Sequence, residues 1–499
     1  MKYSIPQPVV DIVETLRKAH FEAFIVGGCV RDLILHRTPK DWDITTNAVP
    51  EEIIALFPES FYENDFGTVG VKTPRFMEVP DSTKEYDIIE VTTYRTEGNY
   101  EDNRHPTDVH FTLSLEEDLA RRDFTMNALA YGPRTTNEWI LVDLFSGALD
   151  IEKKIIRTVG DPLERFSEDA LRLMRAVRFW SELRDPKEGD VAKNWCIEDE
   201  TFQALQKLSD KLSAISQERI RDELSKIILS NSPSEGVQML HDTNLLRFII
   251  PELELGIGVG QNLHHVYTVW EHNLRALATC PSKKLDVLLA ALLHDVGKPA
   301  TKRGNGLHST FYNHDHVGAR MTEKILTRLR FSKNTIKKAT LLVDNHLFYY
   351  NVDEVTEASV RRLIKRVGLE NMDDLMAVRI GDRLGSGVPK AKPYKLRHLE
   401  YMIDKVSKDP VSVKMLALKG TDLIEVLRIP AGPQIGALLD VLLAEAIEDP
   451  AINTKEALLS RAMILKENPL ETLRTLAKEK IDEKRKEENN QIKKKHWVE

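Results

Sequence analysis

The stretch FIVGGCVRDLILHRTPKDWDIT, residues 24–45, decides the fold of the amino-terminal part of this chain. Its apolar start predicts a strand, and a Gly-Gly turn, a short helix and a second strand follow. Gly27 and Gly28 let the backbone pass close to a bulky anionic group, and the guanidinium of Arg31 is available to a phosphate. The stretch therefore predicts an α+β domain with an anion site at its first turn.

The second strand of this stretch begins with the tripeptide Asp-Trp-Asp. Side chains two residues apart in a strand share a face, so Asp41 and Asp43 are expected side by side. Two carboxylates that close are destabilising unless a cation lies between them. A pair of Mg²⁺ ions held in this way activates an attacking hydroxyl and neutralises a triphosphate. The alternative is two solvated acids in a turn after Pro39.

A third acidic ligand is usual in a two-metal site, and two candidates are present. Glu90 in YDIIEVTTYR is flanked by β-formers and could stand beside the aspartate pair. Asp123 in RRDFTMNALAY is the competitor, although it could simply be an acid in the first turn of a helix. We favour Glu90 as the ligand. Arg121 and Arg122, beside Asp123, have the chemistry to hold phosphates, and Asn127 is either a site residue or a buried amide.

The composition of the whole chain fits a protein of several globular domains. It has 499 residues, of which 42% are hydrophobic and 30% charged, and the net charge of −8 confines any nucleic-acid contact to local patches. Three dispersed cysteines argue against a disulfide framework and for a reducing compartment. Apolar runs such as LDVLLAALL are too short to span a bilayer. We expect a cytoplasmic protein with no membrane segment.

The predicted secondary structure changes near residue 150. Short β-type runs mix with helical stretches before this point, whereas long amphipathic helical patterns dominate after it. A histidine-rich region follows, and the turn signal IPAGPQIG marks a further helical region near the end. The predicted domains are a head at 1–150, a helical neck and body at 151–255, a metal-binding domain at 256–388 and a helical tail at 389–499.

The segment Ser167–Arg175, SEDALRLMR, carries a third group of polar residues. Ser167 is predicted to cap a helix on which Asp169 and Arg172 share a face. A carboxylate beside a guanidinium can imitate a base edge, because it accepts from the exocyclic amine of cytosine or adenine while the guanidinium donates to the ring. Guanine and uracil present the opposite polarity. An ordinary Asp–Arg pair within the helix is the alternative.

The order of these motifs resembles a known family. GGCVRD, KDWDITTNA, FGTVGV, EVTTYR, YRTEGNYEDNRHP, RRDFTMNALA and EDALRLMRAVRF are together similar to the bacterial class II tRNA nucleotidyltransferase/poly(A) polymerase family over about 20–240. The resemblance implies a polymerase-beta-like palm with a mixed sheet, followed by a long all-α region. It also implies that the segment around IPAGPQIG is part of a tail that grips the tRNA elbow.

Site residues are implied by the same resemblance. Asp41 and Asp43 would hold the metal ions, Asp169 and Arg172 would pair with the base of CTP or ATP, and residues 96–104 would form the loop that accompanies the switch from C to A addition. With the anion site at the Gly-Gly turn, the implied nucleotide-binding residues are Gly28, Arg31, Arg121, Arg122, Asp123, Asn127, Asp169, Arg172 and Arg175.

Histidines and aspartates recur on successive predicted helices in VWEHNL, AALLHDVGKP, NHDHVGARM, VDNHLF and RIGDRLGSG. Imidazole and carboxylate ligands that converge in this way suit a transition metal, Mg²⁺ or Mn²⁺. The stretch resembles HD-domain phosphohydrolases, in which a metal-bound hydroxide attacks a phosphoester. A scaffold that retains the fold without activity is the alternative. The resemblance implies the metal ligands His272, His294, Asp295 and Asp382, with His316 and His346 able to hold a second metal.

The predicted function is template-independent addition of CMP and AMP, from CTP and ATP, to the 3′ end of tRNA with Mg²⁺. The tRNA hydroxyl would attack the α-phosphate and pyrophosphate would leave. The alternatives are an enzyme that adds only A or a poly(A) polymerase, an HD phosphohydrolase that acts on nucleotides or RNA ends, and an RNA-binding protein without activity. The sequence leaves open the identity of the second metal and the oligomeric state.

Overall fold

The computed structural model describes residues 3–498, apart from 65–66, 77–85, 98–108, 136–137, 191–192, 262–265, 305, 349–355, 388–393, 408–412 and 414–415. The chain divides into two compact units. The first comprises Met1–Asp344 with Gly381–Gly387, and the second comprises Asn345–Ile380 with Val388–Glu499. The proposed loop at 96–104 lies outside the described residues from position 98 onward.

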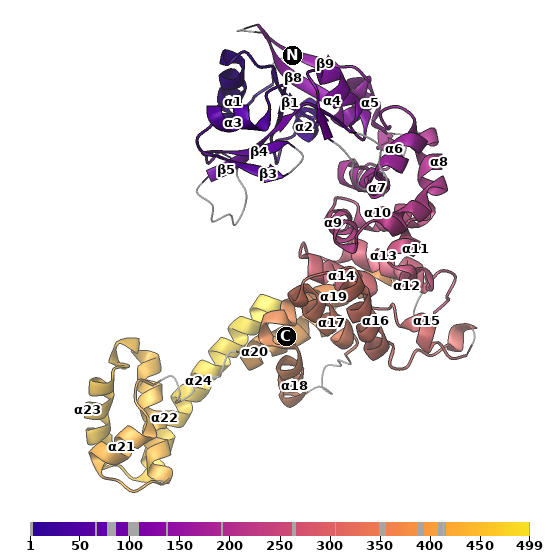
Figure 1. Ribbon diagram of the computed structural model, residues 1–499. Coiled ribbons are helices and arrows are strands. Elements are labelled where there is room, and N and C mark those ends of the chain that lie inside the picture. Colours follow the sequence, from indigo (N-terminus) through magenta and orange to yellow (C-terminus); the bar gives the residue numbers. More distant parts are fainter. Residues whose placement is uncertain are drawn as a thin grey trace. The chain divides into compact units, whose positions relative to one another are not determined.

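Within the described residues, seven strands form the main sheet of the first unit (Figure 1). β2 and β5 pair in parallel, and the other neighbours pair antiparallel. The predicted α+β fold with a mixed sheet is thereby confirmed. The order across the sheet is β3 (Ser60–Asn64), β4 (Thr68–Pro74), β5 (Tyr86–Thr93), β2 (Asp43–Thr46), β1 (Ala23–Val26), β8 (Leu129–Thr135) and β9 (Glu138–Asp143).

The stretch that opens the head folds in the predicted order. β1 is followed by Gly27, then by α2 (Gly28–Ile34) and β2. Gly27 has a φ of 82°, and a side chain there would bring its Cβ to 3.1 Å from Nη1 of Arg122. Glycine is therefore required at this position both by its backbone conformation and by the close approach of an arginine.

Short helices surround the head sheet. α1 (Gln7–Lys18) buries Val9, Ile12, Val13 and Leu16, which recur at helical spacing on one face. The other helical elements are α3 (Pro50–Leu56), α4 (Leu115–Ala120), the 3₁₀ turn η1 (Thr125–Asn127) and α5 (Gly147–Lys153), and a separate short ladder pairs β6 (Arg95–Glu97) with β7 (Val109–Phe111).

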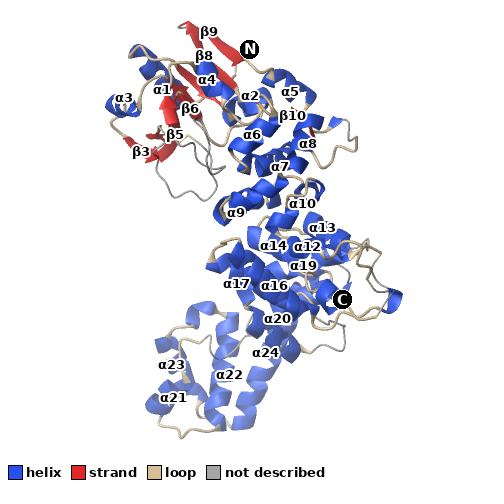
Figure 2. Cartoon of the chain, turned by 45° about the vertical axis from the view of Figure 1, so that its right-hand side comes forward, coloured by secondary structure: helices blue, strands red, loops and turns tan. Residues whose placement is uncertain are grey.

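Helices dominate the chain after the head, as Figure 2 shows by colour. The described exception is the short parallel pair β10 (Ile155–Ile156) and β11 (Cys196–Ile197). The helices of the first unit are α6 (Pro162–Glu168), α7 (Leu171–Leu183), α8 (Asp199–Lys207), α9 (Gln217–Ile228), α10 (Pro233–Asp242), α11 (Leu246–Ile249), α12 (Pro251–Glu254), α13 (Val269–Thr279), α14 (Leu285–Leu293), α15 (Lys298–Thr301), α16 (His314–Arg328) and α17 (Lys333–Asn345).

α14, with the sequence LDVLLAALL, is apolar on every side. Its residues from Val287 to Leu293 are all buried, as expected for a helix without a polar face. The helix ends at Leu293, so the buried core fixes the position of His294, which caps it, and of Asp295 after it. Among the described residues, no helix combines the length and the apolar character that crossing a bilayer requires.

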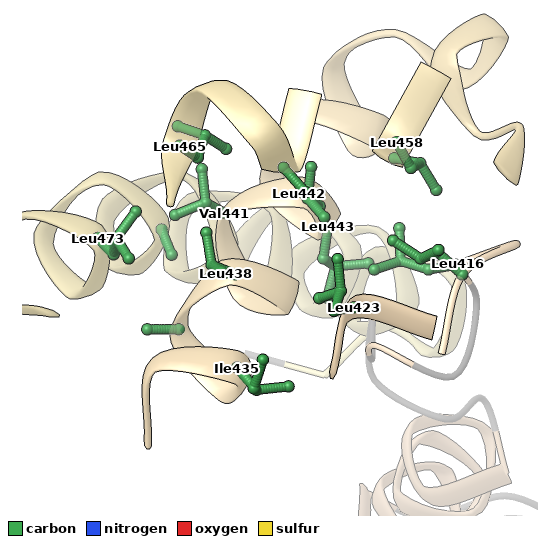
Figure 3. Close-up of a cluster of buried hydrophobic side chains, with 14 of the residues drawn as sticks. Leu416, Leu423, Ile435, Leu438, Val441, Leu442, Leu443, Leu458, Leu465 and Leu473 are labelled. Carbon is green, nitrogen blue, oxygen red and sulfur yellow. The ribbon is translucent and has the colours of Figure 1, made fainter. Parts of the chain in front are cut away.

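The second unit has a hydrophobic core of its own. Figure 3 shows leucines such as Leu438, Leu442 and Leu458 gathered between its helices, and these side chains are fully buried. The first four residues of the turn signal IPAGPQIG lie between two helices, and the second of these helices begins at Pro433 within the signal. The helices are α18 (Glu357–Val367), α19 (Met372–Gly385, whose last turn belongs to the first unit), α20 (Tyr394–Ser407), α21 (Gly420–Leu427), α22 (Pro433–Glu448), α23 (Lys455–Leu465) and α24 (Leu470–His496).

Candidate active site

A cleft of about 1230 Å³ in the first unit gathers most of the predicted site residues. Eleven lysines and arginines line it, against six aspartates and glutamates, so the cleft is strongly basic although the whole chain is acidic. Such a local excess of positive charge attracts a polyanion. The predicted residues that line the cleft are Gly28, Arg31, Asp41, Asp43, Arg121, Arg122, Asp123, Asn127, Asp169, Arg172 and Arg175.

The two aspartates of Asp-Trp-Asp both line this cleft. β2 begins at Asp43, so Asp41 lies just before the strand and the prediction that both occupy the strand is wrong. Trp42 between them is 3% exposed, and its burial in the core fixes the backbone that carries both carboxylates. Both carboxylates therefore line the cleft as predicted, but Asp41 does so from the residues before the strand and not from the strand itself.

Glu90 lies directly opposite Asp43 in the parallel register of β2 and β5. Residues in register on neighbouring strands present their side chains on the same face of the sheet. Glu90 is exposed and is not among the residues that line the cleft. Its role as the third metal ligand stays a prediction, which the strand register supports.

Asp123, the competing ligand, is buried and engaged by three donors. Arg175 Nε lies 2.6 Å from Oδ2, while the side-chain amide of Asn127 and the backbone amide of Phe124 donate to Oδ1 over 3.2 and 2.9 Å. Burial acts to raise the pKa of Asp123, but Arg175 and Arg172 outweigh it and lower this pKa to about 2. The ionised carboxylate thus holds Arg175 and Asn127 in the cleft.

Arg121 and Arg122 both form ion pairs with Asp118, a residue that was not predicted from the sequence. Arg121 Nη2 lies 2.7 Å from Oδ1 of Asp118, and Arg122 Nη2 lies 3.2 Å from Oδ2. Asp118 is fully buried; burial acts to raise its pKa, but Arg122 and Arg121 lower it overall. The spacing of an acid three and four residues before two arginines could have indicated this clamp.

The helix that was predicted to carry the base-reading pair is in fact two helices. α6 continues to Glu168, and Ser167 lies inside it rather than at a cap. Asp169 follows in an extended conformation, and α7 begins at Leu171, whose backbone amide donates to Asp169 over 3.0 Å. Asp169 and Arg172 therefore share the cleft but not one helix.

Asp169 and Arg172 each have other partners in this state of the protein. Asp169 Oδ2 accepts from Nη2 of Arg219 over 2.8 Å, while Arg172 pairs with Glu168 and donates to the carbonyl of Arg121 over 3.2 Å. Arg219, from α9, is a cleft residue that the sequence did not reveal, because fifty positions separate it from its partner. The two members of the predicted base edge are thus held separately, each by its own neighbours.

A second cluster of buried polar groups lies in the helical part of the first unit. His272 Nε2 is 2.9 Å from His294 Nε2, 3.1 Å from Asp295 Oδ2 and 3.3 Å from Asp382 Oδ1. Burial acts to lower the pKa of His272, but Asp295 and Asp382 raise it to about 9. His272, His294 and Asp382 offer two imidazole nitrogens and a carboxylate oxygen close enough together to hold a divalent metal ion, and Oδ2 of Asp295 lies 3.1 and 3.2 Å from the two imidazole nitrogens.

Of the two histidines predicted to hold a second metal, His316 lies away from the cluster. His316 is exposed and its Nδ1 lies 2.6 Å from Asp344, whereas the ring of His314 is buried with Nε2 at 3.3 Å from Asp295. His314, which was not among the predicted ligands, therefore replaces His316 as the candidate second-metal ligand. His346 is a buried residue of the second unit, and its role as a ligand stays a prediction.

Three models of known domain families match successive parts of the chain. Residues 23–157 match the poly A polymerase head domain, residues 194–256 match the probable RNA and SrmB-binding site of polymerase A, and residues 262–384 match the HD domain. These matches confirm the family resemblance that the order of the motifs indicated, and they confirm a polymerase head followed by a helical region with an HD domain.

Curated relatives are similar to one half of the chain. The CCA-adding enzyme of Anoxybacillus flavithermus is 42% identical over 245 residues, which are 49% of this chain and 55% of the relative. The CCA-adding enzyme of Geobacillus kaustophilus is 40% identical over 243 residues, which are 49% of this chain and 54% of the relative. The chain thus spans about half the length of the curated relatives that it matches.

Solved structures extend the similarity along the chain. The Bacillus stearothermophilus CCA-adding enzyme in complex with CTP has a TM-score of 0.58 at 28% identity, covering 92% of this chain and 96% of that one. The Thermotoga maritima CCA-adding enzyme complexed with tRNA has a TM-score of 0.51, with 93% and 97% coverage. Its identity is 18%, so this second likeness concerns the fold alone.

Proposed function

We propose that this chain is a template-independent CCA-adding tRNA nucleotidyltransferase, which transfers CMP and AMP from CTP and ATP to the 3′ end of tRNA. The observation that carries the proposal is the cleft in which Asp41 and Asp43 meet Asp169, Arg172 and a surplus of arginines. The CCA-adding relatives support the assignment through the half of the chain that they cover.

Asp41 and Asp43 would hold Mg²⁺, with Glu90 as the candidate third ligand beside Asp43. Bound Mg²⁺ supplies a positive charge that neutralises the triphosphate and lowers the pKa of the attacking tRNA hydroxyl. Two arginines of the chain bind the phosphate groups. Arg121 and Arg122, whose positions are fixed by buried Asp118, donate charge-assisted hydrogen bonds to the phosphate oxygens. These groups are in place before the nucleotide enters, so little reorganisation is needed.

The base is read by protein side chains. Asp169 accepts from the exocyclic amine of C or A, and Arg172 donates to the ring, once each turns from its present partner toward the nucleotide. Arg219 limits this motion, because it forms an ion pair with the Asp169 carboxylate in the cleft. U and G leave a buried donor or acceptor unpaired and are rejected for that reason.

The proposal assigns a role to each of the four predicted regions. Residues 1–150 form the nucleotidyltransferase head, 151–255 select the base and bind RNA, 256–388 form the HD domain, and 389–499 bind tRNA as a tail. A tRNA substrate and three free cysteines agree with a place in the cytoplasm.

A second activity is proposed for the buried cluster around His272. Its two histidines and two aspartates would hold a divalent metal, which would supply a bound hydroxide for attack on a phosphoester. His314, beside Asp295, is placed to orient that carboxylate or to bind a second ion. This would make the chain a metal-dependent phosphohydrolase as well as a nucleotidyltransferase.

The proposed transfer is tested by sequencing the 3′ ends made on three tRNAs, which end before CCA, after C and after CC. We expect all three to be completed to CCA with CTP and ATP. Extension of the CC-ended tRNA alone would identify an A-adding enzyme, and long runs of A would identify a poly(A) polymerase. Failure to extend any of them would contradict the proposal.

Replacing Arg172 tests the base-reading role of this residue. We expect Arg172→Ala to reduce the preference for CTP and ATP over UTP and GTP by about 10- to 100-fold, because the donor to the base edge is lost. Steady-state incorporation of each of the four nucleotides measures the effect. Arg165→Ala, which removes the neighbouring partner of Glu168, is the control. Unchanged selectivity in the Arg172 variant would show that the base is read elsewhere.

A further inference from the structure

One aromatic ring lies among three arginines of the cleft. The centroid of the Phe179 ring is 4.1 Å from Cζ of Arg178, 5.2 Å from Cζ of Arg31 and 5.3 Å from Cζ of Arg175. All four residues line the cleft, and Phe179 is 5% exposed. The three guanidiniums thus lie within the range in which a ring attracts a cation.

The arginines around this ring come from two parts of the fold. Arg31 belongs to α2, directly after the Gly-Gly turn, whereas Arg175 and Arg178 belong to α7, the helix that also carries Phe179. The ring therefore joins the helix beside Asp43 to the helix beside Asp169.

Three guanidiniums this close repel one another. Burial, and after it the charge of Arg175, lowers the pKa of Arg178, which shows the cost of holding these cations together. Carboxylates offset part of this cost: Asp32, Asp123 and Glu223 lie at 2.9, 2.6 and 3.3 Å from Arg31, Arg175 and Arg178, respectively. A ring adds attraction without occupying an N–H donor, so the remaining donors stay available to phosphate.

We propose that Phe179 is a positioning residue of the nucleotide site, whose ring holds Arg31, Arg175 and Arg178 where they meet the triphosphate of the incoming nucleotide. This inference rests on the proposed function and adds to it a residue that touches no reacting atom. The aromatic character of the side chain, rather than its volume, is what the site requires.

The test compares Phe179→Leu with a matched change in the same core. We expect Phe179→Leu to raise the KM for both ATP and CTP about tenfold, with kcat within about twofold, since three cation–ring attractions are lost. Phe166→Leu is the control, because Phe166 is a fully buried aromatic residue that does not line the cleft. Its KM should stay near that of the natural protein, and Phe179→Tyr should restore the natural value.

Two further arms keep the inference open to refutation. Pentafluorophenylalanine at position 179 retains the shape of the ring and reverses its charge distribution, so it should weaken nucleotide binding even if Phe179→Leu does not fold. The affinity for ATP with Mg²⁺, measured without tRNA, tests the role of the ring alone. If the natural protein failed to extend tRNA, that result would refute the proposed function and not the role of the ring. An unchanged affinity in the fluorinated protein, or equal KM shifts for Phe179→Leu and Phe166→Leu, would overturn the inference.

Discussion

Asp43→Asn is expected to abolish the extension of tRNA that lacks its 3′ end, with a loss of at least about 1,000-fold in rate. The substitution removes a charge that lines the cleft at the start of β2, while the amide keeps the size of the side chain. A metal ion contributes several kcal/mol to stabilising the charge that develops in phosphoryl transfer, and about 4 kcal/mol corresponds to this factor. Incorporation of labelled CMP in single-turnover reactions measures the loss.

The control for this variant is Asp11→Asn, which changes an exposed acid of α1 in the same head. It should keep the natural rate. Extension by Asp43→Asn at more than about a tenth of the natural rate would show that the metal ions of this chain are held elsewhere. Asp41→Asn should behave like Asp43→Asn, because both carboxylates line the same cleft.

His294→Ala is expected to remove bound metal from the second cluster and to lower any phosphodiesterase or phosphatase activity by more than about 100-fold. Loss of groups that merely support metal ligands already costs about 10- to 100-fold, and this change deletes a proposed ligand itself. CMP and AMP addition to tRNA should continue, because the base-reading cleft contains no residue of this cluster. Metal content per chain and hydrolysis of a phosphodiester substrate measure the two effects.

His316→Ala provides the matched control for that experiment. His316 is exposed and paired with Asp344, so its replacement should leave the metal content unchanged. Equal metal loss in both variants would contradict the arrangement of the cluster, and loss of tRNA extension in His294→Ala would show that the two activities share a site.

The sequence was sufficient where local chemistry dictates the structure. Two adjacent glycines between an apolar run and a short helix can form only a few turns, and the structure has the predicted strand, turn and helix there. The apolar run of α14 has no polar face and must be buried, which fixed the position of His294. In both cases the residues of the segment itself determine its structure, so the sequence pattern alone was enough to predict it.

The predictions from sequence were wrong where contacts between residues far apart in the chain determine the local structure. Ser167 has the residue type of a helix cap, yet Asp161 caps α6 and Arg219 holds Asp169 in the extended break between α6 and α7. No local rule foresees a partner fifty residues away. The prediction of His316 as a ligand failed for a related reason. His314 and His316 lie two positions apart in α16, and only the packing of this helix shows that His314 is the one that faces Asp295.

The most direct test of this account measures the affinity of the natural protein for each of the four nucleoside triphosphates, with Mg²⁺ and without any tRNA. If Asp169 and Arg172 read the base, CTP and ATP should bind about 10- to 100-fold more tightly than UTP and GTP, because only the first two satisfy the hydrogen-bonding groups of both residues. Equal affinity for all four triphosphates would contradict the claim that protein side chains alone select the nucleotide.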